Sequence, residues 1–337
     1  MKFAKDRIMK TMRTVMVLLY AICISCTDVE EGILLAAGNQ LIEVNRDGEV
    51  LDIIKFPDQD GIYDAWRLPD GGVVYVHRLG LVLLDAENNI LMEHKAVKGR
   101  EGAEINSVEV LDGGEKFAVM ESGINKILII DRNDKVLNSI ALPDLTKEHP
   151  HFRYRMIRKV NGEDAFWVAQ KRRKTLVKVN YNSGRIHKEI YLDSYLKPSA
   201  QKDQCSAVVQ APDGSLYTTT SDGRRIVHIG KDGKLISRWT SEDLGISTRQ
   251  FEGMQLLENG NIMVTCSDFH LKSADENKDL LAEITPKGKV VWRLSREEII
   301  DQIVGYVQPT AQIEETRITN VHVYDKLKIE DCLNVNR

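Results

Sequence analysis

The chain of 337 residues lacks most of the features that would identify a function at once. It has five cysteines, too few for a disulfide scaffold, and the three that follow residue 26 form no CxxC motif and no metal-like Cys/His spacing. Its 46 Lys and Arg against 50 Asp and Glu give a net charge of −4, which argues against a nucleic-acid partner. A GxSxG elbow, a Walker loop, an HExxH motif and an EF-hand loop are all absent. What remains is the composition of a folded globular protein, 42% hydrophobic and 28% charged.

The N-terminus carries an export signal. Five basic residues within the first 13 precede the apolar run from Val15 to Ile24, and Ser25-Cys26 follows. This run is too short to span a bilayer as a helix, which needs about 20 residues, and the pattern is typical of a secretory signal peptide. The small residue before Cys26 resembles the lipobox of bacterial lipoproteins, although Cys23 stands where that family prefers Leu. The alternative is an ordinary signal peptide, cleaved nearby to release a soluble exported protein.

The lipoprotein resemblance implies the following organisation. Residues 1–25 would be the signal peptide, and residues 26–31 a tether whose acylated Cys26 inserts fatty chains into the lipid bilayer. Asp28, Glu30 and Glu31 resemble the surface-export signals of lipoproteins in the Bacteroides group. We therefore expect a protein anchored in the bacterial outer membrane or at the cell surface. Cys205, Cys266 and Cys332 would then be small buried residues with at most one disulfide among them.

Two interleaved series of turns repeat along the chain. The first series is Asp70-Gly71, Asp112-Gly113, Asn161-Gly162, Asp213-Gly214 and Asn259-Gly260. The second ends at Gly48, Asn89, Asp134, Gly184, Gly233 and Gly288. Both have a period of about 48 residues, which is typical of a propeller repeat. We expect type I′ hairpins at the Asp-Gly and Asn-Gly pairs, because both central residues of that turn need a positive φ.

The segments between these turns are rich in β-branched and aromatic residues, and each period holds four short strands. The sequence therefore predicts an all-β, six-bladed β-propeller over residues 32–325, followed by a C-terminal tail at 326–337. The first unit, 32–56, supplies only three strands, and 317–323 supplies a strand without a partner. We expect these two segments to close the ring in one blade. A seven-bladed propeller is the alternative, because 241–310 is long enough for another set of strands.

One segment resembles a known family. In Ala282-Glu-Ile-Thr-Pro-Lys-Gly288-Lys-Val-Val-Trp292, the Ala, Gly and Trp have the spacing of the tryptophan-docking motif of quinoprotein alcohol dehydrogenases. Ile284 and Lys287 depart from that motif, and the same segment is similar to bacterial arylsulfotransferase propellers. The resemblance implies a blade-edge Trp that packs on the neighbouring blade, and it carries no chemistry. With no adjacent Cys pair and too few residues for eight blades, we expect no quinone and no other cofactor.

The segments predicted to line the central channel are unusually polar, and a polar concavity is the default place for a ligand. The expected ligand-binding residues are Asp64, Trp66, Glu104, Asn106, His151, Arg153, Arg155, Glu252 and Asn320. Their spacing would place His151, Arg153 and Arg155 on one face of a strand. Such a group could bind a sulfate, phosphate or carboxylate. Pairing of the arginines with acids from adjacent blades is the favoured interpretation, ahead of ligand binding and of catalysis by His151 or His322. The run Lys171-Arg-Arg-Lys174 is expected to be a solvated hairpin tip, and His228 is expected at the surface.

These observations favour a lipid-anchored binding module over an enzyme. Its partner would be a small molecule, a glycan or an envelope protein, bound in the axial channel. The alternative is an envelope enzyme (an arylsulfotransferase-like transferase, a lactonase or a polysaccharide-lyase-like protein) that uses the same channel. A third hypothesis is a purely structural subunit of an envelope assembly.

Overall fold

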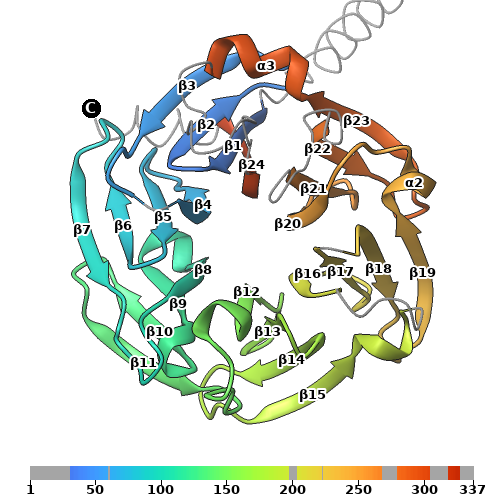
Figure 1. Ribbon diagram of the computed structural model, residues 1–337. Helices are drawn as coiled ribbons and strands as arrows, with labels where there is room; N and C mark the ends of the chain where they lie inside the picture. Colours follow the sequence, from blue (N-terminus) through green and yellow to red (C-terminus); the bar gives the residue numbers. More distant parts are fainter. Residues whose placement is uncertain are drawn as a thin grey trace, which may run out of the picture.

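The computed structural model describes residues 31–59, 61–196, 203–221, 223–267, 279–303 and 318–326. Within these ranges, six four-stranded antiparallel sheets stand side by side around a central axis (Figure 1). The predicted six-bladed β-propeller is therefore confirmed, and the seven-bladed alternative is wrong. The signal peptide and the tether lie almost wholly outside the described residues.

Each blade runs from an inner strand at the axis to an outer strand at the circumference. Blade 1 consists of β24 (Ile318–Asp325), β1 (Glu31–Ala37), β2 (Gln40–Val44) and β3 (Val50–Lys55). Blade 2 consists of β4 (Ile62–Arg67), β5 (Val73–His77), β6 (Gly80–Leu84) and β7 (Ile90–Lys95). Blade 3 consists of β8 (Ile105–Leu111), β9 (Lys116–Glu121), β10 (Lys126–Asp131) and β11 (Val136–Ala141).

The other three blades follow the same order. Blade 4 consists of β12 (Tyr154–Lys159), β13 (Ala165–Gln170), β14 (Thr175–Asn180) and β15 (Ile186–Tyr191). Blade 5 consists of β16 (Cys205–Gln210), β17 (Leu216–Thr220), β18 (Arg225–Ile229) and β19 (Leu235–Thr240). Blade 6 consists of β20 (Gln250–Leu256), β21 (Ile262–Ser267), β22 (Asp279–Ile284) and β23 (Val290–Ser295). The short helices are η1 (Asp112–Gly114), η2 (Ser122–Ile124), η3 (Pro150–Phe152), η4 (Leu192–Ser194), α2 (Ser241–Leu244) and α3 (Arg296–Ile303).

The core lies between the blades. The second and third strands of a blade are buried along nearly their whole length, as in β9 and β10, whereas the outer strand β11 is mostly exposed. One apolar cluster joins blades 2 and 3 through residues such as Val76 and Phe117, and another joins blades 3 and 4 through Ile129 and Phe166. Each blade thus buries both faces against its neighbours, which explains the near-continuous apolar runs of its middle strands.

Four of the five Asp-Gly and Asn-Gly turns differ from the expected type I′ geometry, whereas at Asp112-Gly113 both residues have a positive φ, of 51° and 67°. At Asp70-Gly71 only the glycine has a positive φ, of 81°. The hydrogen bonds Gly71 N to Leu68 O and Leu68 N to Gly72 O enclose a three-residue loop, the arrangement of a type I turn followed by a glycine in the left-handed region. The Asp70 carboxylate accepts a hydrogen bond from Gly72 N at 3.0 Å. The aspartate is therefore selected by its side-chain bond and the glycine by its φ.

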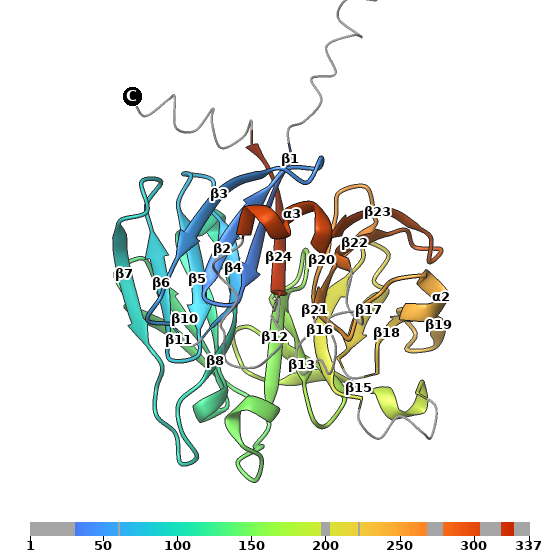
Figure 2. The same cartoon turned by 45° about the horizontal axis from the view of Figure 1, so that its top comes forward.

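The two ends of the chain close the ring, as predicted. Strand β24 pairs antiparallel with β1 from Glu31↔Asp325 to Ala36↔Asn320. This pairing lies on the inner side of blade 1, next to the propeller axis (Figure 2). It satisfies the ladder of β1, whose exposed edge would otherwise invite pairing with another chain.

The tryptophan of the docking-like segment packs on the next blade. Trp292 of blade 6 donates its Nε1–H to Arg46 O in the β2–β3 turn of blade 1 at 2.8 Å. In the same way Trp239 of blade 5 lies over Gly288 of blade 6, where an added Cβ would be 2.2 Å from the indole Nε1. Gly288 therefore leaves room for the neighbouring indole. None of the described helices is long and apolar enough to cross a membrane.

Candidate functional site

Every inner strand is interrupted by a bulge near its start. The pairing of inner strand with second strand shifts register at Ile62/Asp64, Ile105/Val108, Tyr154/Ile157, Cys205/Val208 and Phe251/Met254, and in β24 opposite Ala36/Ala37. A β-bulge leaves residues unpaired and redirects their side chains, and bulges are frequent beside functional sites. Six of them at one level of the channel turn a ring of side chains toward the axis.

The bulged residues line a hollow of about 210 Å³, part of which is open to solvent. Its wall is formed by Tyr63, Asp64, Asn106, Ser107, Arg155, Met156, Ser206, Glu252, Thr319 and Asn320. All six inner strands contribute, so the hollow lies on the propeller axis. We call these ten residues the axial ring. Five of the nine expected ligand-binding residues belong to it, namely Asp64, Asn106, Arg155, Glu252 and Asn320.

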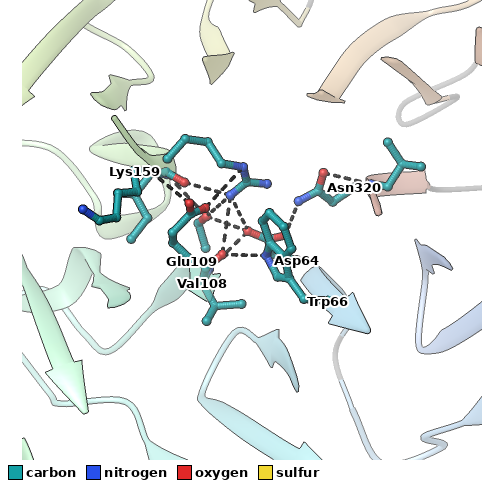
Figure 3. Close-up of polar contacts among 10 residues, drawn as sticks. Asp64, Trp66, Val108, Glu109, Lys159 and Asn320 are labelled. Atoms are coloured by element: carbon teal, nitrogen blue, oxygen red, sulfur yellow. Dashed lines mark hydrogen bonds and ion pairs between the residues drawn. The ribbon is translucent and has the colours of Figure 1, made fainter. Parts of the chain in front are cut away.

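Asp64 is the best-connected member of the axial ring (Figure 3). Its carboxylate, 1% exposed, accepts hydrogen bonds from Ser107 Oγ at 2.6 Å, Val108 N at 3.1 Å and Arg158 Nη1 at 3.1 Å. Asn320 Nδ2 donates to the other oxygen. The acid thus joins blades 1, 2, 3 and 4 at the axis.

Arg158 is not part of the axial ring, but it connects Asp64 of the ring to Glu109. Its guanidinium is 3.7 Å from Glu109 Oε2 and 5.0 Å from the centre of the Trp66 ring. Burial raises the pKa of Glu109 to about 7, although the charge of Arg158 acts in the opposite direction. Near neutral pH this carboxyl is therefore partly protonated, and Asp64 carries most of the compensation for Arg158.

A second pair crosses the ring. Arg155 Nη2 is 3.6 Å from Glu252 Oε2, and Arg155 Nη1 donates to Asn106 Oδ1 at 3.3 Å. The guanidinium also stacks over the ring of Tyr63 at 4.9 Å. Both acids of the axial ring therefore face an arginine, although each pair joins blades that are not adjacent, whereas the pairing interpretation expected acids from adjacent blades.

The Ser206 hydroxyl differs from the other polar groups of the axial ring in its hydrogen bonding. Ser206 is 1% exposed, and among the described residues its Oγ has no hydrogen-bond partner. A buried hydroxyl without a partner costs about 1–3 kcal/mol. Because Ser206 lines the hollow, a molecule bound there is the nearest available partner.

The remaining expected residues lie elsewhere. Trp66 donates its Nε1–H to Val108 O and packs at 4.6 Å against the ring of His322, between blades 1 and 2. His322 Nδ1 accepts from Arg67 N at 3.0 Å, and burial lowers the pKa of this imidazole to about 3. Neither residue is in the axial ring, and both belong to contacts between blades.

The expected single strand face for His151, Arg153 and Arg155 is wrong, because only Arg155 lies on β12. His151 lies in η3, and Arg153 follows it with an αR backbone. The Arg153 guanidinium is 1% exposed and donates to Glu148 O at 2.7 Å, Ser122 O at 3.0 Å and Gly123 O at 3.1 Å. It holds loops together instead of facing the hollow.

Glu104 and His151 meet beside the ring. His151 Nδ1 is 2.9 Å from Glu104 Oε1, and His151 Nε2 is 3.2 Å from Lys171 Nζ. Lys171 was expected in a solvated tip but is 7% exposed. His228 is also buried, stacked at 4.0 Å on Tyr217.

Arg158, Ser107 and Lys171 were missed by sequence reasoning. Arg158 stands three residues after Arg155 on the same inner strand, and Ser107 follows Asn106. If side chains alternated regularly along each strand, Arg158 would point away from Arg155 and Ser107 away from Asn106. The bulges interrupt this alternation, so both residues of each pair can face the same region. Lys171 was missed because it stands in the basic run Lys171-Arg-Arg-Lys174, and such a composition usually indicates a solvated surface.

Comparison with known proteins identifies the fold of this chain but assigns it to no family. No family model matches the chain, and a search of curated proteins gave no match either. A Bacteroides caccae protein of unknown function is similar with a TM-score of 0.69 and 17% identity, over 87% of this chain and 98% of the other. A putative 6-phosphogluconolactonase from Bacteroides fragilis has a TM-score of 0.54 and 12% identity, over 89% and 99%. A catalytically inactive virginiamycin B lyase from Staphylococcus aureus has a TM-score of 0.53 and 14% identity, over 79% and 85%. At these identities the likeness shows that the chain is a β-propeller and nothing finer.

Proposed function

We propose that this protein is a binding module of the bacterial cell envelope whose ligand occupies the axial hollow. The observation that carries the proposal is the convergence of polar side chains from all six bulged inner strands on one hollow. The buried Ser206 hydroxyl, which has no hydrogen-bond partner in the part of the chain that the structure describes, supports the same conclusion. Rigid strands hold these groups, so they can recognise a ligand without a large loss of conformational entropy.

The size and charge of the hollow limit the ligand. The enclosed space in the hollow is about 10 Å³, which is room for about one water molecule and far below the roughly 300–1,000 Å³ typical of drug-sized sites. Without movement of the ring side chains, the hollow therefore admits only a single small group of a ligand, such as one hydroxyl of a glycan. The two acids of the ring are balanced by Arg155 and Arg158. A neutral, hydroxyl-bearing ligand therefore fits better than a polyanion, with Tyr63 as an apolar contact.

The test is ligand binding by the full-length protein in detergent, with a glycan array and calorimetry of monosaccharides. Ser206→Val places an apolar side chain in the hollow and should abolish binding. Ser237→Val is the matched control, because the buried Ser237 hydroxyl also has no partner among the described residues but lies on the outer strand β19 of the same blade. Equal binding by both variants would count against the hollow, and no binding by the unmodified protein would count against the module.

The envelope location rests on the N-terminal sequence. Cys26 would be acylated after signal cleavage and would hold the propeller at the outer membrane. We expect Cys26→Ser to move the protein from the membrane fraction to the soluble fraction, and mass spectrometry of the N-terminal peptide to find the lipid mass on Cys26. An unmodified Cys26 in membrane-bound protein would refute the anchor.

A further inference from the structure

A buried histidine of blade 2 lies between two carboxylates of blade 3. His94, on the outer strand β7, is 7% exposed. Its Nε2 is 3.1 Å from Oε1 of Glu121, the last residue of β9, and its Nδ1 is 2.5 Å from Oδ1 of Asp134, in the turn between β10 and β11. We call His94, Glu121 and Asp134 the blade clamp. None of the three lines the axial hollow, so the clamp is separate from the candidate site.

The two acids of the blade clamp differ in their access to water. The Glu121 side chain is 0% exposed, and its two oxygens also accept from Val97 N, each at 3.2 Å. The Asp134 side chain is 40% exposed. A buried carboxylate that loses a donor finds no replacement, whereas an exposed one can bind water instead. A change in the imidazole therefore affects the contact with Asp134 first.

The number of protons on the imidazole decides whether both contacts can be hydrogen bonds. An imidazolium carries an N–H on each ring nitrogen, whereas a neutral imidazole carries only one. Burial lowers the pKa of His94, but the hydrogen bonds and charges of Glu121 and Asp134 outweigh it, so this pKa is raised above 6.5. The two acids thus hold the imidazole in its doubly protonated form to a higher pH than water would.

Other charges lie around the blade clamp without entering it. Strand β6, which pairs with β7 and places Leu81 opposite His94, contains no ionisable residue. The charged residues beside the clamp in sequence or across a strand pair are all at least partly exposed: Glu93, Lys95, Lys98, Lys126, Arg132 and Lys135. Water screens such groups, so the two acids of the clamp dominate the titration of His94.

We propose that the blade clamp is a pH-sensitive contact, in which protonated His94 holds both acids of blade 3 and neutral His94 releases Asp134. The single proton of the neutral ring stays on Nε2, because the buried Glu121 has no other access to a donor there. The Nδ1 lone pair then faces the Asp134 carboxylate, and two acceptors repel each other. The Asp134 side chain turns toward solvent, and the β10–β11 turn is no longer held to β7.

The release is confined to the circumference of the ring. Nearer the axis, blades 2 and 3 are joined by the apolar cluster that includes Val76 and Phe117, and burial of apolar surface does not depend on protonation. Because the pKa of His94 is raised in the folded state, the contact is complete below pH 6.5 and is lost as pH rises through the higher folded value. The rim between these blades is therefore tighter in acid than in alkaline solution, whether or not the axial hollow binds a ligand.

The first test is a pH titration of the histidine Cε1–H resonances by NMR on the full-length protein in detergent, with His94 assigned through His94→Gln. We expect the His94 inflection above pH 6.5. Asp134→Asn should lower it by about 0.5–1 pH unit, because one of two favourable charges is lost. Asparagine tolerates the φ of 61° at position 134, so this variant keeps its turn. An inflection below pH 6.5, or one that Asp134→Asn does not move, would overturn the proposal.

The second test measures hydrogen exchange of the 132–137 turn by mass spectrometry at about pH 5.5 and about pH 8.5, on either side of the titration of an imidazole. Corrected for the intrinsic rate, protection should be about two- to tenfold lower at the higher pH, as for loss of one partly exposed ion pair. The internal control is the 231–234 turn of blade 5, because Ile190 of blade 4 stands in the strand position of His94.

The variants separate the blade clamp from a general effect of pH. In both His94→Gln and Asp134→Asn, protection of the 132–137 turn should no longer change with pH beyond the change in the control turn. A purely structural contact would lower protection in the variants by the same factor at both pH values. Protection that does not depend on pH in the unmodified protein, or a pH dependence that persists in both variants, would overturn the proposal.

Discussion

Replacement of Asp64 by asparagine tests whether the axial network holds the propeller together. Asp64→Asn keeps the shape but removes the charge that faces Arg158 Nη1 at 3.1 Å, and one of its atoms becomes a donor opposite Ser107 Oγ and Val108 N. The Arg158 side chain is 10% exposed, and its other acid, Glu109, is partly protonated near neutral pH. Removing one partner of a buried pair costs about 3–5 kcal/mol, a large share of the roughly 5–15 kcal/mol that stabilises a typical protein.

The expected fall in Tm is about 6–10 °C for a chain of this size, measured by calorimetry at pH 7.5. The Arg158→Met background provides the decisive comparison, because it leaves no buried guanidinium without a partner. Asp64→Asn should therefore cost clearly less there, as a double-mutant cycle would measure. Glu101→Gln, which removes an acid whose ion pair among the described residues is with the exposed Arg100, should leave Tm unchanged. An equal cost of Asp64→Asn in both backgrounds, or a cost below about 1 kcal/mol, would refute the reasoning.

Three further predictions concern pH and packing. Burial raises the pKa of Glu109 from 4.5 to about 7, which adds stability to the folded state that is fully present below pH 4.5 and is lost as pH rises through 7. The free energy of unfolding, measured with urea, should therefore fall by about 3 kcal/mol between pH 4.5 and pH 8, and Glu109→Gln should remove that fall. His322, with a pKa lowered from 6.5 to about 3, contributes stability above pH 6.5 that is lost as pH falls toward 3. In His322→Asn this acid loss should shrink by up to about 5 kcal/mol, and an unchanged profile would contradict the buried neutral imidazole. An added Cβ at Gly253 would be 2.7 Å from Thr319 O, so Gly253→Ala should cost about 1–3 kcal/mol by overpacking the contact with β24; an unchanged midpoint of denaturation would show that this contact is loose.

Much of the architecture was predictable because it repeats. The turns at Asp70-Gly71 and Asp213-Gly214 recur with the period of a blade, and the alternation between them identifies four strands. The unpaired segment near Val321 and the three-strand first unit predicted the closure, since an open ring leaves an unsatisfied edge. The position of Trp292 likewise predicted a contact with the next blade. Each of these features follows from local chain geometry and from the need to bury both faces of a blade.

The candidate site was predictable only in part. The polar inner strands pointed to Asp64, Asn106, Arg155, Glu252 and Asn320, because inner strands face the axis in any propeller. Which residues share the hollow could not be predicted, because a bulge shifts the register by one residue and reverses the direction of each side chain after it. Arg153 was expected in the channel for a different reason: the inner strand was expected to include it, whereas β12 begins at Tyr154 and Arg153 holds the loop before it.

The sequence by itself determined the all-β propeller fold and the closing pair, and it favoured six blades over seven, because these features depend on patterns that recur along the chain. Only the tertiary structure decided that Asp64 meets Arg158, that Ser206 faces the hollow and that Glu104, His151 and Lys171 come together. Those contacts join residues that are 20 to 94 positions apart in the sequence, separations that no local pattern encodes. Their geometry depends on how the ring closes, and ring closure is a property of the whole chain.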